Sequence, residues 1–186
     1  VLSISDGAIY VVHRVVEIGA SSVADAALGV PFNKNLNLSG GTAPHVVTVV
    51  RGALPDGLGI VNGAITGMPT KMKKYSFSLQ VTEQGGASTT KDFQSRIYRG
   101  LAIATRTLPK GRVGRRYFAD LAGMFGKNPH TWSLVAGTLP VGLTMAPATG
   151  RITGTPTAAG IANLTFQVTD GIGVAVQKAL NIEIQP

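Results

Sequence analysis

A run of basic residues between positions 96 and 116 has the clearest capacity for chemistry in this sequence. Seven of the 17 Lys and Arg residues of the 186-residue chain fall there, and no Asp or Glu interrupts them. Such a concentration of positive charge attracts polyanions directly and through the release of their counterions. We therefore hypothesise contact with an anionic partner through Arg106, Lys110, Arg112, Arg115 and Arg116.

The alternative interpretation of this run is a solvated linker whose charge aids solubility. Its aromatic residues are Tyr98, Tyr117 and Phe118, and no nucleic-acid-binding motif accompanies it. Specific recognition of nucleic acid is therefore not expected. If the run does bind, the expected partner is an acidic protein surface or a polysaccharide.

Patterns that support catalysis or metal binding are not found in the sequence. The chain has no Cys, three His and nine scattered acidic residues. It contains no GxSxG, no HExxH and no phosphate-binding glycine loop. We therefore expect neither an enzyme, nor a metal site, nor a cofactor.

Four residues that could bind a ligand are better explained by structural roles. Asp170 follows a strand-like stretch and is expected to turn the chain by accepting backbone hydrogen bonds. His45 and His130 occupy equivalent places in an internal repeat and are expected to pack. Trp132, the only Trp, could stack on a sugar if exposed, but its place on a predicted strand favours the core.

Two long segments repeat one another and define the architecture. LPxGL, GxITGxPT and QVT occur in the same order in 52–83 and in 137–170, at an offset of 85 to 87 residues. Each Pro presets a turn and each following Gly allows a positive φ. The repeat predicts a first module at 24–103 and a second module at 104–186.

Both copies of the repeat end in strands with strict alternation. Leu164, Phe166 and Val168 are apolar and are separated by polar residues. The corresponding stretch of the first copy has Phe77, Leu79 and Val81 at the same spacing. A period of two residues is typical of a strand with one buried face, so both modules are predicted to be all-β.

The first 23 residues stand outside the repeat and form a predicted N-terminal strand segment. The stretch 8–18 is apolar on both faces, so it needs cover on both sides. Either it pairs within its own chain, or it adds to a sheet of another subunit as an assembly strand. It is too short and too charged to cross a membrane. The face proposed for assembly carries Tyr10, Val12, Val16 and Ile18.

Together these motifs resemble the bacterial Ig-like modules that are related to dystroglycan-type cadherin-like domains. The second copy matches closely, whereas the first has Val47 in place of Trp132 and Met68 in place of Thr155. The resemblance covers roughly residues 24 to 186. It implies two tandem Ig-like or cadherin-like β-sandwich modules, used as spacers or adhesive units, and no reaction.

The function expected from this reading is structural. Our first choice is a phage virion protein, either a decoration protein or a tail-associated protein, on the virion surface. Alternatives are a spacer or adhesive segment of a bacterial cell-surface protein, and an accessory carbohydrate-binding module of a secreted enzyme. No secretory signal is visible. The expected partners are a larger assembly (a capsid, a tail or a cell-surface protein) and further copies of the chain.

Overall fold

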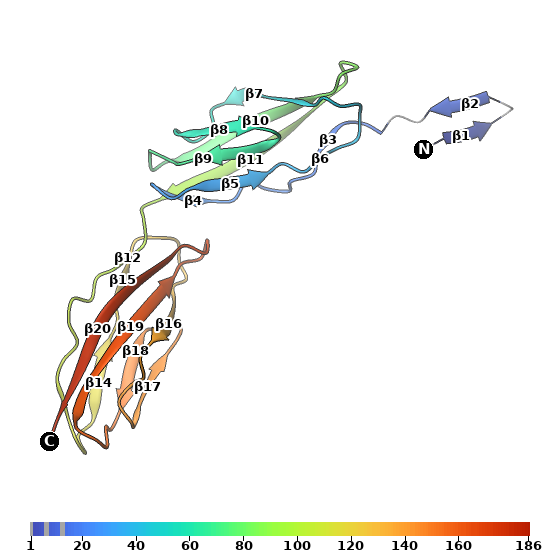
Figure 1. Cartoon of the computed structure of the whole chain (residues 1–186). Helices are drawn as coiled ribbons and strands as arrows, with labels where there is room; N and C mark the ends of the chain where they lie inside the picture. The colour runs from blue at the N-terminus through green and yellow to red at the C-terminus, as the bar shows by residue number, and fades with distance from the viewer. Residues whose placement is uncertain (1, 6–7, 12–13) are drawn as a thin grey trace. The chain divides into compact units, whose positions relative to one another are not determined.

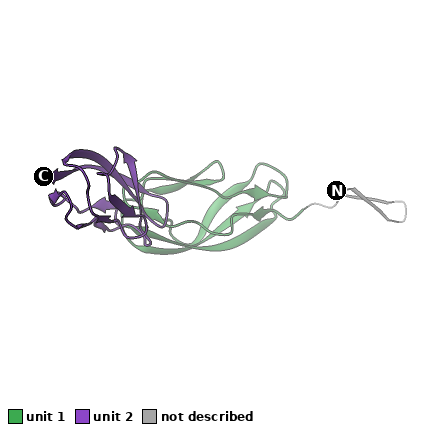
Figure 2. Cartoon of the chain, turned by 90° about the horizontal axis from the view of Figure 1, so that it is seen from below, with its two compact units in different colours: residues 1–98 green, residues 99–186 purple. Residues whose placement is uncertain are grey.

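The computed structural model describes residues 2–5, 8–11 and 14–186, and every regular element in these ranges is a β-strand (Figure 1). The chain divides into two compact units, Val1–Tyr98 and Arg99–Pro186 (Figure 2). Within the described ranges no helix occurs that could span a membrane.

The first unit begins with an antiparallel pair, β1 (Leu2–Ser5) and β2 (Ala8–Val11). Its other strands form sheets in the orders β4-β11-β10-β7, β5-β9-β8 and β3-β6. They are β3 (Glu17–Ile18), β4 (Ala26–Ala27), β5 (Phe32–Asn35), β6 (Leu38–Ser39), β7 (Val46–Gly52), β8 (Leu58–Val61), β9 (Ala64–Gly67), β10 (Lys74–Thr82) and β11 (Ser88–Tyr98).

The second unit repeats this topology with sheets in the orders β13-β20-β19-β16, β14-β18-β17 and β12-β15. In both units a short strand, β4 or β13, runs parallel to the last strand, and the other strand pairs of the four-stranded sheet are antiparallel. The strands are β12 (Ala102–Ile103), β13 (Gly111–Arg112), β14 (Tyr117–Asp120), β15 (Gly123–Met124), β16 (Thr131–Ala136), β17 (Leu143–Ala146), β18 (Arg151–Gly154), β19 (Gly160–Thr169) and β20 (Ala175–Gln185).

Each unit has its own apolar core between its four-stranded and three-stranded sheets. In the second unit Phe166 of β19 and Ile152 of β18 are both fully buried in one cluster. In the first, Leu79 of β10 and Ile65 of β9 take the same roles. The predicted alternation is confirmed, because one face of β10 and of β19 enters the core.

The repeated LPxGL segments form tight turns that need their glycines. The Leu143 N–H donates to the Pro140 carbonyl at 3.0 Å, and Gly142 adopts a φ of +93°. A Cβ at Gly142 would lie 2.1 Å from the Thr155 carbonyl oxygen. Only glycine therefore fits this close approach of two backbone segments.

The boundaries of the units differ from those predicted. The first unit ends at Tyr98 rather than at 103, because Leu101 and Ile103 are buried in the core of the second unit. Residues before position 24 also belong to the first core, where Val16 and Val23 are buried. The repeat could not show this, because its motifs mark turns and strands but not the segments that complete each core.

The predicted N-terminal strand is divided between two pairings. Tyr10 lies in β2, which pairs with β1, whereas Ile18 lies in β3, which pairs with β6. Val12 lies outside the described residues. Val16 and Ile18 are 0% and 4% exposed in the core of the first unit. They are therefore core residues and are not available as the assembly face that the sequence suggested.

Candidate functional site

The basic segment of the second unit forms a tight turn between β13 and β14. Its backbone is fixed at three points: the Val113 N–H donates to the Gln185 carbonyl at 2.9 Å, Gly114 N–H to Pro156 at 2.9 Å, and Arg115 N–H to Arg112 at 3.1 Å. This framework presents four exposed cationic side chains, Lys110, Arg112, Arg115 and Arg116, which we call the basic face.

The basic face borders an open groove of about 450 Å³. All four cations line it, together with Tyr117, Phe118 and Gln185 among others. Tyr117 is buried, whereas Phe118 on the next position of β14 is 54% exposed. The groove therefore combines positive charge with an aromatic surface.

Most of the charge on the basic face is unpaired within the described residues. The Lys110 ammonium lies 2.9 Å from the Glu183 carboxylate, and this hydrogen bond lowers the pKa of Glu183. No carboxylate described in the structure lies within ion-pair distance of Arg112, Arg115 or Arg116. Three guanidinium groups are thus free to bind an anion.

Arg106, the fifth predicted residue, does not join this groove. It lines a separate open depression of about 350 Å³ on the outer face of β19 and β20, beside Asn163 and Asn181. The structure therefore brings together four of the five predicted contact residues. Arg106 and Lys110 are close in sequence, but the extended chain between them places their side chains in different depressions. The sequence alone did not show this separation.

The first unit shows that the fold does not require a basic face. Its corresponding turn has the same backbone bonds, from Gly29 N–H to Pro69 at 2.9 Å and from Val30 N–H to Ala27 at 3.2 Å. The positions matching the four cations hold one acid and three apolar residues, namely Asp25, Ala27, Val30 and Pro31. The cations of the second unit are thus an addition to a shared framework.

Comparison with known proteins identifies the shared framework. The family model described as "Putative Ig domain" matches residues 15–97 and 120–185. The chain belongs to this family. Both units are therefore Ig modules, which is compatible with a structural or interaction role. A closer kinship with dystroglycan-type cadherin-like domains stays a prediction.

The fold of the two Ig modules is similar to that of a solved structure. Extracellular domains 3–5 of Drosophila OTK give a TM-score of 0.53 at 9% identity, covering 94% of this chain and 63% of that chain. The titin I-band fragment I67–I69 gives 0.47 at 10% identity, covering 88% and 62%. No match is found among curated proteins.

One similarity at higher identity is confined to a fragment. A Bacteroides fragilis protein described as a "putative alpha-galactosidase" is 25% identical, with a TM-score of 0.41 over 45% of this chain. This chain spans 17% of the length of that protein. The similarity therefore does not extend to a whole enzyme.

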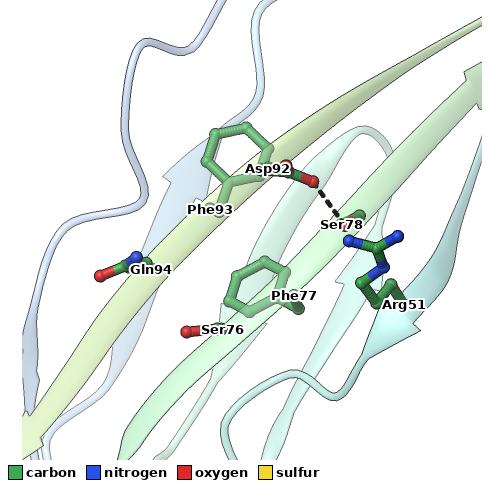
Figure 3. A pocket seen from close by; sticks show the side chains of 7 residues that line it. All are labelled: Arg51, Ser76, Phe77, Ser78, Asp92, Phe93 and Gln94. Atoms are coloured by element: carbon green, nitrogen blue, oxygen red, sulfur yellow. Dashed lines mark hydrogen bonds between the residues drawn. The ribbon is translucent and has the colours of Figure 1, made fainter.

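A second, unpredicted feature recurs on the four-stranded sheet of both Ig modules. In the first module an open depression of about 260 Å³ is lined by residues of β7, β10 and β11 (Figure 3). The β10 and β11 residues correspond, 87 positions earlier, to those around Arg106. Figure 3 shows the lining residues Arg51, Ser76, Phe77, Ser78, Asp92, Phe93 and Gln94.

The two depressions differ in the origin of their arginine. Arg51 comes from β7, at one side of its sheet, whereas Arg106 comes from the segment that precedes β13. In the first module the Ser78 hydroxyl donates to the Asp92 carboxylate at 2.5 Å, so this acid already has a partner. A pairwise comparison of the outward-facing residues in the two repeats could have revealed this correspondence.

The structural roles predicted for Asp170 and Trp132 are confirmed. The Asp170 carboxylate accepts hydrogen bonds from the N–H groups of Lys127, Ile172 and Val174, at 3.1, 3.0 and 2.9 Å. Trp132 is 5% exposed in the core of the second Ig module. It is therefore not a platform for stacking on a sugar.

The two equivalent histidines make the same local bond. Nε2 of His45 lies 2.9 Å from the Gly40 carbonyl, and Nε2 of His130 lies 2.9 Å from the Phe125 carbonyl. Both rings thus hold the loop five residues upstream. In residues 14–186 no group of three or more His, Asp or Glu residues could hold a metal ion.

Tyr117 makes the second Ig module sensitive to alkaline pH. Burial raises the pKa of its phenol to about 12, and its hydroxyl donates to the Pro109 carbonyl at 3.0 Å. Because the folded-state pKa is raised, the stability linked to it is complete below pH 10 and declines as the pH rises towards 12.

We expect the urea midpoint of this module, followed by Trp132 fluorescence, to fall between pH 10 and 12. The expected loss is roughly 2 kcal/mol. The variant Tyr117→Phe should be less stable at neutral pH but should depend less on pH. Equal pH slopes in the two proteins would show that another group titrates.

Proposed function

We propose that this chain is a non-catalytic contact and spacer unit of an exposed assembly, and that its second Ig module binds an anionic surface through the basic face. One observation carries the proposal. Two modules share a turn with the same backbone hydrogen bonds, yet only one of them displays four cations there. Because packing does not demand these residues, binding is the better explanation for them.

A matched pair of variants tests this contact with heparin as the anionic probe. Replacing Arg112, Arg115 and Arg116 with Ser should weaken binding and lower the slope of log affinity against log salt by roughly two to three. The control replaces Lys71, Lys73 and Lys74 of the first module with Ser, which removes the same charge from a different surface. If both variants lose affinity equally, only the net charge of +8 matters and the site does not exist.

The assembly that we favour is a phage virion, with the chain as a decoration or tail-associated protein on its surface. The basic face, which only the second Ig module carries, suits attachment to an acidic capsid or tail protein. The alternative is a spacer or adhesive segment of a bacterial cell-surface protein. Intact mass in the native source distinguishes them, since the first predicts a mass near 19.2 kDa and the second a much larger one.

An accessory carbohydrate-binding role is less well supported. Such modules bind sugars on exposed aromatic rings, and Trp132 lies in the core. Phe118 and Phe125 are exposed, but the guanidinium groups of Arg151 and Arg99 lie 4.8 and 3.8 Å from the centres of their rings. These rings are therefore already stacked within the module.

A further inference from the structure

The outermost strand of the larger sheet in the first Ig module is unusually open. β7 pairs with β10 on one side and is the last strand in the sheet order (Figure 1). Six of its seven residues are exposed, and Val46, Val49 and Val50 have exposed fractions of 56%, 37% and 50%. A long, valine-rich edge of this kind is a template for pairing with another strand.

The second Ig module closes the same edge with a backbone bond. There β16 is the outermost strand, and its Trp132 N–H donates to the Pro147 carbonyl at 2.8 Å. Pro147 belongs to the turn between β17 and β18, which folds over the edge. An incoming strand would have to displace this bond.

The first Ig module lacks this closure because its turn is two residues shorter. Asn62 and Gly63 connect β8 to β9, where the second module has Pro147, Ala148, Thr149 and Gly150. Val47 pairs with Val81 in the register in which Trp132 pairs with Val168, so its N–H points away from β10 as that of Trp132 points away from β19. No backbone acceptor for the Val47 N–H occurs among the residues that the structure describes.

We propose that β7 is an edge-to-edge interface between two copies of this chain, paired antiparallel about a twofold axis near Thr48. An extended strand is the partner that satisfies the outward N–H and C=O groups of β7. A second copy offers the same groups in the same spacing, and a twofold axis satisfies both sets at once. The stretch from Val46 to Val50 carries no charge, so the two edges can meet without repulsion despite the basic composition.

The β-bulge of β7 limits this interface to the first part of the strand. The register with β10 shifts where Val50 is inserted, between Ser78 and Leu79. The bulge twists the strand beyond this point and turns Arg51 towards the depression of Figure 3. Pairing about Thr48 therefore keeps the two copies of Arg51 apart.

The test is the mass of the full chain in solution as a function of concentration, by sedimentation or light scattering. We expect the mass to rise from 19.2 kDa towards twice that value. Thr48→Lys brings two like charges together at the axis and should weaken dimerisation roughly tenfold or more. Ser133→Lys, the equivalent exposed position of β16, is the matched control and should leave dimerisation unchanged.

A second variant tests the edge without altering β7. Replacing Asn62 and Gly63 with the sequence Pro-Ala-Thr-Gly of the second module should rebuild the closing bond and give a monomer. Hydrogen exchange of the Val47 amide should also become slower as the concentration of the wild-type chain rises, and should not depend on concentration in the variant. A wild-type chain that stays monomeric at every concentration, or a dimer that Thr48→Lys leaves intact, would overturn the proposal.

Discussion

Replacing Phe166 with Ala is expected to destabilise the second Ig module by about 3 to 5 kcal/mol. The side chain is fully buried in β19. It lies in a cluster that takes residues from both sheets of the module, among them Ile152 and Ile182. Truncation removes the transfer energy of the ring and leaves a cavity that rigid strands cannot fill.

Trp132 gives this experiment a local signal. It is the only Trp of the chain and is buried in the same core, so its fluorescence in a urea titration follows the second Ig module. The control is Phe118→Ala, since this ring is 54% exposed and should cost less than about 1 kcal/mol. If the two variants shift the midpoint equally, the assignment of Phe166 to the core is wrong.

Asp170→Ala is expected to lower the free energy of unfolding of the second Ig module by about 3 kcal/mol. Asp170 is 5% exposed, and its carboxylate accepts hydrogen bonds from three backbone N–H groups. Two of these groups lie in the loop between β19 and β20, and the third lies in the loop between β15 and β16. Removing the carboxylate leaves several donors without an acceptor in a place that water reaches poorly. Asp170→Asn, which keeps one acceptor oxygen, should recover part of the loss.

Asp120 provides a matched control for Asp170. Its carboxylate accepts a hydrogen bond from Arg151 Nε at 2.9 Å, and both side chains are about half exposed. Water screens exposed ion pairs of this kind, so they contribute little to stability and Asp120→Ala should change the urea midpoint little. If Asp120→Ala lowers stability as much as Asp170→Ala does, burial of the carboxylate does not determine the size of the loss.

Local patterns of the sequence predict the turns of this protein and the buried faces of its strands. Glycines that must adopt a positive φ, such as Gly142, indicate turns. The alternation of apolar and polar residues around Phe166 indicates a strand with one buried face. The burial of Trp132 and the turning role of Asp170 follow from their places in the repeat. These features were predictable because the repeat and the local pattern mark each position, although Asp170 also accepts a hydrogen bond from the distant Lys127 N–H.

The tertiary structure alone decided which distant residues meet. It placed Val16 in the first core, separated Arg106 from the basic face and left the edge of β7 open beside the shorter turn of the first module. The change of the repeat offset from 85 to 87 residues marks the shorter turn, but the consequence of that turn for the edge, like the other two outcomes, depends on hydrogen bonds and packing between segments far apart in sequence. The sequence by itself determined the modules and their turns, whereas long-range contacts determined which surfaces remain available for binding.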